Sequence, residues 1–193
     1  MFNLPVPGMP NAPIPGAPFG SALAGNTPAP TPKRDDTVPP EADFDRSISY
    51  YADYSGCGHW RMIWPEHILN AHQKYVCHGT TMMVLDERYY QNCTAVRVQR
   101  QATKQQLQFI QLLKDFQKRH NFRIIYDIDD LVFHEDIPDY NKFKTAFINP
   151  EIRESACAIM GLCDEITVTC QFMKDYYTEK TGNKNITVIP NYP

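Results

Sequence analysis

The chain has 193 residues, 42% of them hydrophobic and 21% charged, which suits one ordinary domain with a tail and excludes a fibrous or wholly disordered protein. Its 19 lysines and arginines against 22 aspartates and glutamates give a net charge of −3, so no electrostatic attraction draws it to nucleic acid or an anionic membrane. No hydrophobic run approaches the roughly 20 residues that span a bilayer, and the N-terminus does not have a signal-peptide pattern. We therefore expect a cytoplasmic protein with no nucleic-acid or membrane partner.

The six cysteines favour reduced thiols over a disulfide framework, because a framework of that kind is typical of small secreted chains. Their spacing contains no C-x-x-C pair, so it does not support a zinc site. We expect mostly buried thiols and no metal at these positions, which are Cys57, Cys77, Cys93, Cys157, Cys163 and Cys170.

Residues 1–45 are predicted to form an extended proline-rich arm, because 11 of the 16 prolines lie within residues 1–40 and such a composition cannot build a core. A polyproline II helix has three residues per turn, so prolines spaced by three present one ridge to a protein partner. The arm is therefore either a docking segment for a larger assembly or a disordered leader. The prolines with this spacing form two sets, Pro7, Pro10 and Pro13, and Pro15 and Pro18.

Residues 46–193 alternate between segments with strand and helix character. In chain order we expect strands at 47–54, 80–85, 95–98, 122–128, 165–169 and 186–189. Between them we expect helices at 65–72, 103–118, 151–160 and 171–180, the second of which starts with a capping box at Thr103 and Gln106. Strands that alternate with crossover helices predict an α/β domain, a Rossmann-like, doubly wound parallel sheet.

A glycine turn, G-C-G-H-W-R, follows the first predicted strand at residues 56–61. Gly56 and Gly58 would let backbone amides approach an anion or a sugar, or would simply form a tight turn. Arg61 stands where the dinucleotide-binding fingerprint has its third glycine, so the sequence does not favour an NAD site. This arginine either binds a phosphate or carboxylate ligand or pairs with a carboxylate such as Asp53.

Three carboxylates, Asp127, Asp129 and Asp130, stand at the end of the fourth predicted strand. Alternation along a strand puts Asp127 and Asp129 on one face. Carboxylates this close repel one another unless they are solvated, hydrogen-bonded or in contact with a cation or sugar hydroxyls, so they are either site residues or a solvated cap on the next turn. A D-x-D triplet recurs by chance, and we expect no metal here. His59, in the glycine turn, is either a general base or sugar contact, or an ordinary histidine.

Five motifs occur in a familiar order: G-C-G-H-W-R at 56–61, V-R-V-Q-R at 96–100, I-I-Y-D-I-D-D at 124–130, C-D-E-I-T-V-T at 163–169 and V-I-P-N at 188–191. Together they resemble the N-terminal half of GT-B glycosyltransferases of the GT4-like type, which include phage-encoded members. The resemblance implies an acceptor-side Rossmann-like domain over residues 46–193, with a nucleotide-sugar as donor and no bound cofactor or metal. It also implies that the glycine turn faces a cleft with Asp129 and Asp130 opposite.

Two functions remain open. In the first, the chain is a glycosyltransferase with Asp129, Asp130 and His59 as catalytic residues and Gly56, Gly58, Arg61 and Asp127 as ligand-binding residues. The sequence stops at Pro193, where the resemblance expects a donor-binding domain, so we expect this segment alone to be inactive. In the second, it is a non-catalytic structural or docking component of a large assembly, such as a phage virion, anchored by its arm. The protein would then lie in the host cytoplasm or the virion.

Overall fold

The computed structural model describes residues 45–54, 56–72, 75–142 and 144–191. The predicted arm, with its two sets of prolines, lies outside these residues except for Asp45, so the arm and its partner stay predictions. None of the described helices is long and apolar enough to cross a bilayer. All six cysteines lie in the described part of the chain and are free, with Cys93 and Cys163 buried, Cys170 exposed and the other three half-buried.

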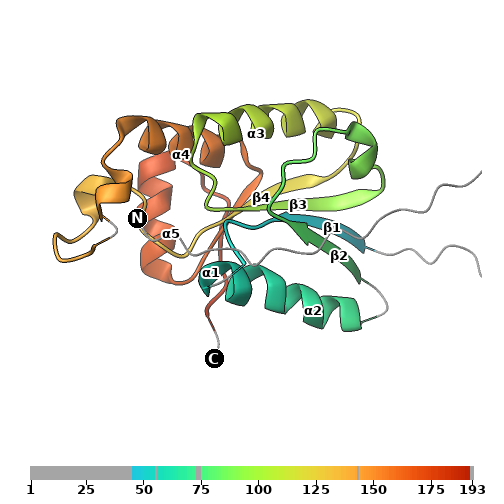
Figure 1. Ribbon diagram of the computed structural model, residues 1–193, viewed down its shortest axis with the longest axis horizontal. Helices are drawn as coiled ribbons and strands as arrows, with labels where there is room; N and C mark the ends of the chain where they lie inside the picture. Colours follow the sequence, from blue (N-terminus) through green and yellow to red (C-terminus); the bar gives the residue numbers. More distant parts are fainter. Residues whose placement is uncertain (1–44, 55, 73–74, 143, 192–193) are drawn as a thin grey trace, which may run out of the picture. The chain divides into compact units, whose positions relative to one another are not determined.

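The described residues form one six-stranded sheet in which every neighbouring pair is parallel (Figure 1). The strand order is β2-β1-β3-β4-β5-β6, so the connections leave β1 and β3 in opposite directions. An open α/β sheet binds its ligands at such a switch point, beyond the carboxyl ends of the strands. The strands are β1 Asp45–Tyr50, β2 Tyr75–Thr80, β3 Cys93–Gln99, β4 Arg123–Asp127, β5 Glu165–Val168 and β6 Ile186–Val188.

Helices cover both faces of this sheet (Figure 1). In this view α3 and α4 lie above the sheet and α1 and α2 below it. A π-helical turn, His59–Ile63, joins α1 to α2, so that residues 56–71 form one uninterrupted helical segment. Short 3-10 turns occupy Glu87–Tyr90, His134–Asp136 and Lys144–Phe147. The helices are α1 Gly56–Gly58, α2 Trp64–Ala71, α3 Lys104–Gln117, α4 Pro150–Leu162 and α5 Gln171–Thr181.

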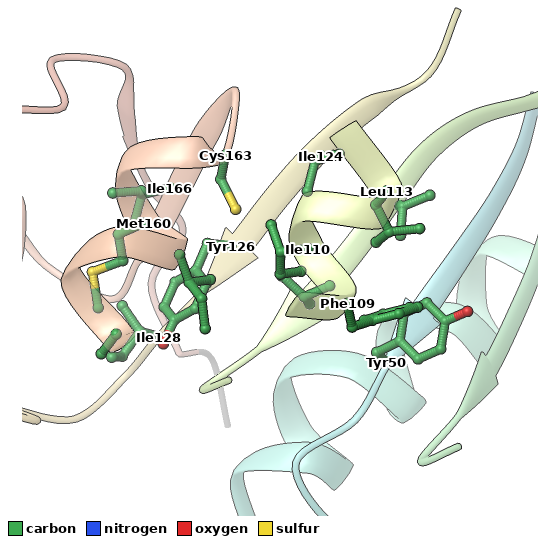
Figure 2. Close-up of a cluster of buried hydrophobic side chains, with 14 of the residues drawn as sticks. Tyr50, Phe109, Ile110, Leu113, Ile124, Tyr126, Ile128, Met160, Cys163 and Ile166 are labelled. Carbon is green, nitrogen blue, oxygen red and sulfur yellow. The ribbon is translucent and has the colours of Figure 1, made fainter. Parts of the chain in front are cut away.

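The hydrophobic core lies between the sheet and helices α3 and α4 (Figure 2). Alternate residues of the central strands point into it, such as Ile124 and Tyr126 of β4, both completely buried. The ring of Phe109 in α3 meets the ring of Tyr50 edge to face, with 4.9 Å between centroids. The predicted capping box of α3 is confirmed, because Thr103 accepts from the Gln106 N–H and the Gln106 side chain accepts from the Thr103 N–H.

The opposite face of the sheet, below which the 56–71 segment packs, is polar. The strand residues on this face alternate with the core residues, and several are buried polar side chains. The helical segment adds two buried charged residues of its own. We call this set the polar layer, and its members are Ser49, Gln99, Asp127 and Thr167 of the strands and Arg61 and Glu66 of the helical segment. The ion pair of Arg61 and Asp127 joins this segment to β4, and Arg97 of β3 adds a hydrogen bond to the carbonyl of Arg61.

The α/β, all-parallel, Rossmann-like prediction is confirmed, and five of the six strands lie where the sequence placed them. The strand predicted at 80–85 is wrong, because β2 is Tyr75–Thr80 and the apolar run after it leaves the sheet. Met82 and Leu85 of that run are exposed. Since β2 is an edge strand with β1 as its neighbour, it needs less apolar surface than a central strand, and its mixed sequence gives a weak pattern. The connection from β2 to β3 contains a 3-10 turn, Glu87–Tyr90, and no α-helix.

Candidate functional site

The carboxyl ends of β1, β3 and β4 bring together a group of charged side chains next to the switch point. Arg100 follows β3 directly, and its two terminal nitrogens bind different carboxylates. Nη1 lies 2.8 Å from Oδ2 of Asp130, and Nη2 lies 2.9 Å from Oδ2 of Asp53. With Asp129 and Cys57 beside them, these residues make up what we call the edge cluster. It contains three aspartates and one arginine, so it favours hydroxyl or cationic groups over a diphosphate.

Arg100 has an unusual backbone conformation. Its φ of 47° lies in the left-handed region, which a non-glycine residue seldom occupies. Its N–H donates to the carbonyl of Asp127, 3.0 Å away, at the point where β3 and β4 end. This conformation turns the guanidinium toward the loops after β1 and β4. Strained backbone of this kind costs on the order of 1–3 kcal/mol and is concentrated at functional sites.

The side chains of Cys57 and Asp129 are hydrogen-bonded to each other, and each affects the pKa of the other. Burial, the hydrogen bond to the Asp129 carboxylate and the charge of that group together raise the pKa of the Cys57 thiol to about 12. Burial also raises the pKa of Asp129, against the lowering effect of the thiol, and the charge of Asp130 adds to the increase. The thiol is therefore protonated at neutral pH and is not a nucleophile.

A cation would find three donor atoms here. The ligand atoms of Cys57, Asp129 and Asp130 all lie within 4.8 Å of one another. Arg100 already binds one oxygen of Asp130, and a protonated thiol is a poor ligand. The residues present therefore do not fit a metal well.

A cavity of about 340 Å³ opens beside the edge cluster, between the ends of β1 and β3 and the start of α3. Arg100 belongs to both the cavity wall and the edge cluster. The volume is at the lower end of the range for small-molecule sites. The cavity is lined by Tyr50, Tyr51, Ala52, Thr81, Met83, Arg100, Gln101, Ala102, Thr103, Gln106 and Ile152.

Arg61 and Asp127, both predicted to bind ligand, bind each other. The guanidinium approaches the carboxylate with two nitrogens, Nη2 to Oδ1 at 2.6 Å and Nε to Oδ2 at 2.9 Å. The side chains are only 4% and 2% exposed, and Thr167 donates a further hydrogen bond of 2.6 Å to Oδ1 of Asp127. The sequence left open whether Arg61 binds a ligand or pairs with a carboxylate of the chain. The structure favours the ion pair, and the partner is Asp127 and not Asp53.

Arg61 also reaches the segment that follows β6. Its Nη1 donates to the carbonyl of Ile189 at 2.9 Å and to the side-chain oxygen of Asn191 at 3.0 Å. One arginine thus connects the helical segment after β1 to β4 and to the V-I-P-N motif. The polar atoms of Arg61 are engaged in these contacts, which gives the residue a structural role.

The other residues of the glycine turn have different environments. Gly56 is exposed and has a φ of 47°, which favours glycine. Gly58 is buried, and a Cβ added to it would collide with the carbonyl oxygen of Asp53. The ring of His59 contacts Trp60 and Trp64 on the surface of the helical segment. The structure thus brings Asp129 and Asp130 together with Arg100, whereas the described contacts of His59 are aromatic.

Arg100, Cys57 and Gln101 were not among the predicted site residues. Arg100 ends the V-R-V-Q-R motif, and a charged residue directly after a buried strand is the signal that identifies a strand-end site. Asp129 and Asp130 were predicted by that reasoning. Cys57 and Gln101 lack such a signal, because their roles depend on which loops meet at the sheet edge.

We expect the Asp129→Asn variant to be more stable than the wild type at pH 7. The raised pKa means that the folded state disfavours the ionised carboxylate, so folding loses stability as the pH rises from the ordinary value of 3.8 through the folded-state pKa. The gain should therefore shrink as the pH falls toward 3.8. Urea unfolding of both proteins at pH 7 and near pH 4 measures this stability difference. An equal difference at the two pH values would show that it arises from packing and not from ionisation of Asp129.

The fold and the edge cluster together define a doubly wound α/β domain with a polar site at the carboxyl edge of its sheet. A scan of protein-family models, a search of curated proteins and a search of solved structures each found no match to the chain. The function is therefore argued from the site itself.

Proposed function

We propose that this domain is the acceptor-side half of a GT-B-type glycosyltransferase and that it binds a sugar acceptor at the edge cluster. The observation that carries the proposal is the cavity of about 340 Å³ at the switch point, with Arg100 in its wall and the carboxylates of the edge cluster beside it. The five motifs that resemble these enzymes support it. Two of them lie at the carboxyl ends of β3 and β6, two contain β5 and most of β4, and G-C-G-H-W-R forms the helical turns after β1.

The chemistry of the edge cluster suits a polyhydroxylated acceptor. Aspartate oxygens accept hydrogen bonds from hydroxyl groups, and Arg100 holds Asp53 and Asp130 in place on either side. A carboxylate with a raised pKa, such as Asp129, is suited to take the proton of the attacking hydroxyl. In the proposed reaction that oxygen bonds to the anomeric carbon of a nucleotide-sugar, and the nucleoside diphosphate leaves with the bonding electrons. A donor-binding half would have to hold the nucleotide, so we expect this chain alone to bind the acceptor without transferring a sugar.

Titration of the ¹⁵N-labelled chain with neutral mono- and disaccharides tests the proposal. We expect shifts of the amide signals of residues 52–54, 56–57, 100–103 and 129–130 at millimolar ligand, and a tenfold or larger loss of affinity in the Arg100→Gln variant. Arg153→Gln is the matched control, because Arg153 is an arginine in an ion pair on α4, outside the edge cluster and the cavity wall. Sugars that leave these signals unchanged, or shift them equally in Arg100→Gln, would contradict the proposal.

A docking component of a large assembly, such as a phage particle, is the second candidate. The exposed aromatic side chains of the 56–71 segment favour it, because a surface of this kind marks a protein contact, which copies of this chain would use within such an assembly. Deletion of residues 1–39 is the test of the predicted arm. Under this hypothesis the shortened protein no longer enters its assembly, and normal incorporation would contradict it.

A further inference from the structure

The 56–71 segment buries its charged side chains and exposes several large apolar ones, unlike an ordinary amphipathic helix. Its two charged residues, Arg61 and Glu66, are buried against the sheet. Three of its large apolar residues point outward, with Trp60 59%, Trp64 51% and Ile68 51% exposed, whereas Met62 is buried beside the charged pair. A surface helix normally shows the reverse arrangement.

Aromatic contacts organise this outward surface. The ring of His59 lies 6.1 Å from that of Trp64, nearly parallel at 24°, and 5.2 Å from that of Trp60. Trp64 also contacts the ring of His67 at 6.5 Å. The π-helical turn brings residues five apart into register, as the hydrogen bond from the Trp64 N–H to the His59 carbonyl shows. We call this surface the aromatic face, and it comprises His59, Trp60, Trp64, His67 and Ile68.

The aromatic face contains no lysine, arginine, aspartate or glutamate. The exposed residues of the segment are glycine, alanine, asparagine, histidine and apolar residues, although 21% of the whole chain is charged. Most other large exposed hydrophobic residues are spread over different loops and helices, whereas Trp60, Trp64 and Ile68 recur every fourth residue on one helix. A partner selected by charge would find no counter-charge here. A second copy of the same face meets no repulsion and matches it in character.

We propose that two copies of this chain associate through the aromatic face, in an isologous dimer with the helical segments antiparallel. Trp64 lies midway between Trp60 and Ile68 in sequence, so a two-fold axis near Trp64 places Trp60 of each copy opposite Ile68 of the other. Four-residue spacing also forms the ridges that pack helices against each other. This inference is independent of the proposed sugar-binding function, because the edge cluster contributes no side chain to the face.

The chain contains two tryptophans, and both lie on the aromatic face. Intrinsic tryptophan fluorescence therefore reports on this surface without a label. With increasing concentration we expect the emission maximum to shift to the blue while the mass, measured by sedimentation equilibrium, rises from 22.2 kDa to twice that value. The two transitions should have the same midpoint. A chain of monomer mass up to about 0.5 mM would overturn the proposal.

Variants locate the contact. Trp64→Glu places like charges near the two-fold axis and should weaken the dimer at least 100-fold. Phe172→Glu is the matched control, because Phe172 is an aromatic residue of α5 with 64% exposure, and this change should leave the dimer intact. An equimolar mixture of Trp64→Glu and Trp64→Lys should restore association. A dimer that persists in Trp64→Glu, or a blue shift that requires added oligosaccharide or neutral lipid vesicles, would overturn the assignment.

Discussion

Replacement of Asp127 by alanine is expected to lower the free energy of unfolding by about 3–5 kcal/mol. The change removes the partner of a guanidinium that is itself only 4% exposed, and a buried unpaired charge is far more costly than a lost surface contact. It also leaves Thr167 without its acceptor on Asp127. Since domains of this size are stable by about 5–15 kcal/mol, the variant should unfold at a much lower urea concentration.

A double-mutant cycle separates the pair from its surroundings. Arg61→Met combined with Asp127→Leu should cost much less than the sum of the two single changes, because neither charge is then left buried alone. Asp115→Ala provides the control, since Asp115 forms an ion pair with Lys118 on the surface. Removal of this exposed pair should lower the free energy of unfolding much less than Asp127→Ala does. Additive losses in the cycle would show that the two side chains act independently.

Replacement of Gly58 by alanine is expected to destabilise the fold by about 3 kcal/mol. The added methyl group would overlap the backbone carbonyl of Asp53, which a side-chain rotation cannot relieve. The helical segment would therefore have to move away from the loop after β1. Thermal unfolding measures the effect directly, and a change of less than about 0.5 kcal/mol would contradict the close approach.

Gly161 gives a matched comparison with the opposite sign. It lies in α4, and a Cβ added there has no neighbour within 4 Å. Alanine in place of glycine restricts the unfolded chain and favours the helix, so Gly161→Ala should stabilise the protein by up to about 1 kcal/mol. The two variants make the same chemical change, so a difference in sign assigns the loss at Gly58 to the local collision.

The sequence was informative wherever burial imposed a simple pattern. Helix α3 was predicted from its capping box and apolar spacing, and β4 from its hydrophobic run, because both pack against the core. The edge strand β2 was misplaced, since the apolar residues that follow it are exposed in a loop. Hydropathy alone does not distinguish a half-exposed strand from an apolar loop.

The site was predicted in outline only. Asp129 and Asp130 follow a buried strand, and that position alone predicts the carboxyl edge of a parallel sheet. The partner of Arg61 could not be chosen from the sequence, because Asp53 and Asp127 are both carboxylates at strand ends. The choice depends on which strand passes above the helical segment, and therefore on strand order. Arg100 has the same signal, since it directly follows β3, but its carboxylate partners could be assigned only once β1, β3 and β4 were known to end side by side.

The polar layer has a consequence for how the 56–71 segment is positioned. A helix held by apolar side chains can shift along a sheet and exchange one contact for a similar one at little cost. The bidentate pair of Arg61 and Asp127 allows no such sliding, because a displacement of a single residue would leave both charges buried and unmatched. The segment therefore has a single position on the sheet. This position also fixes Cys57, at the start of the segment, beside Asp129.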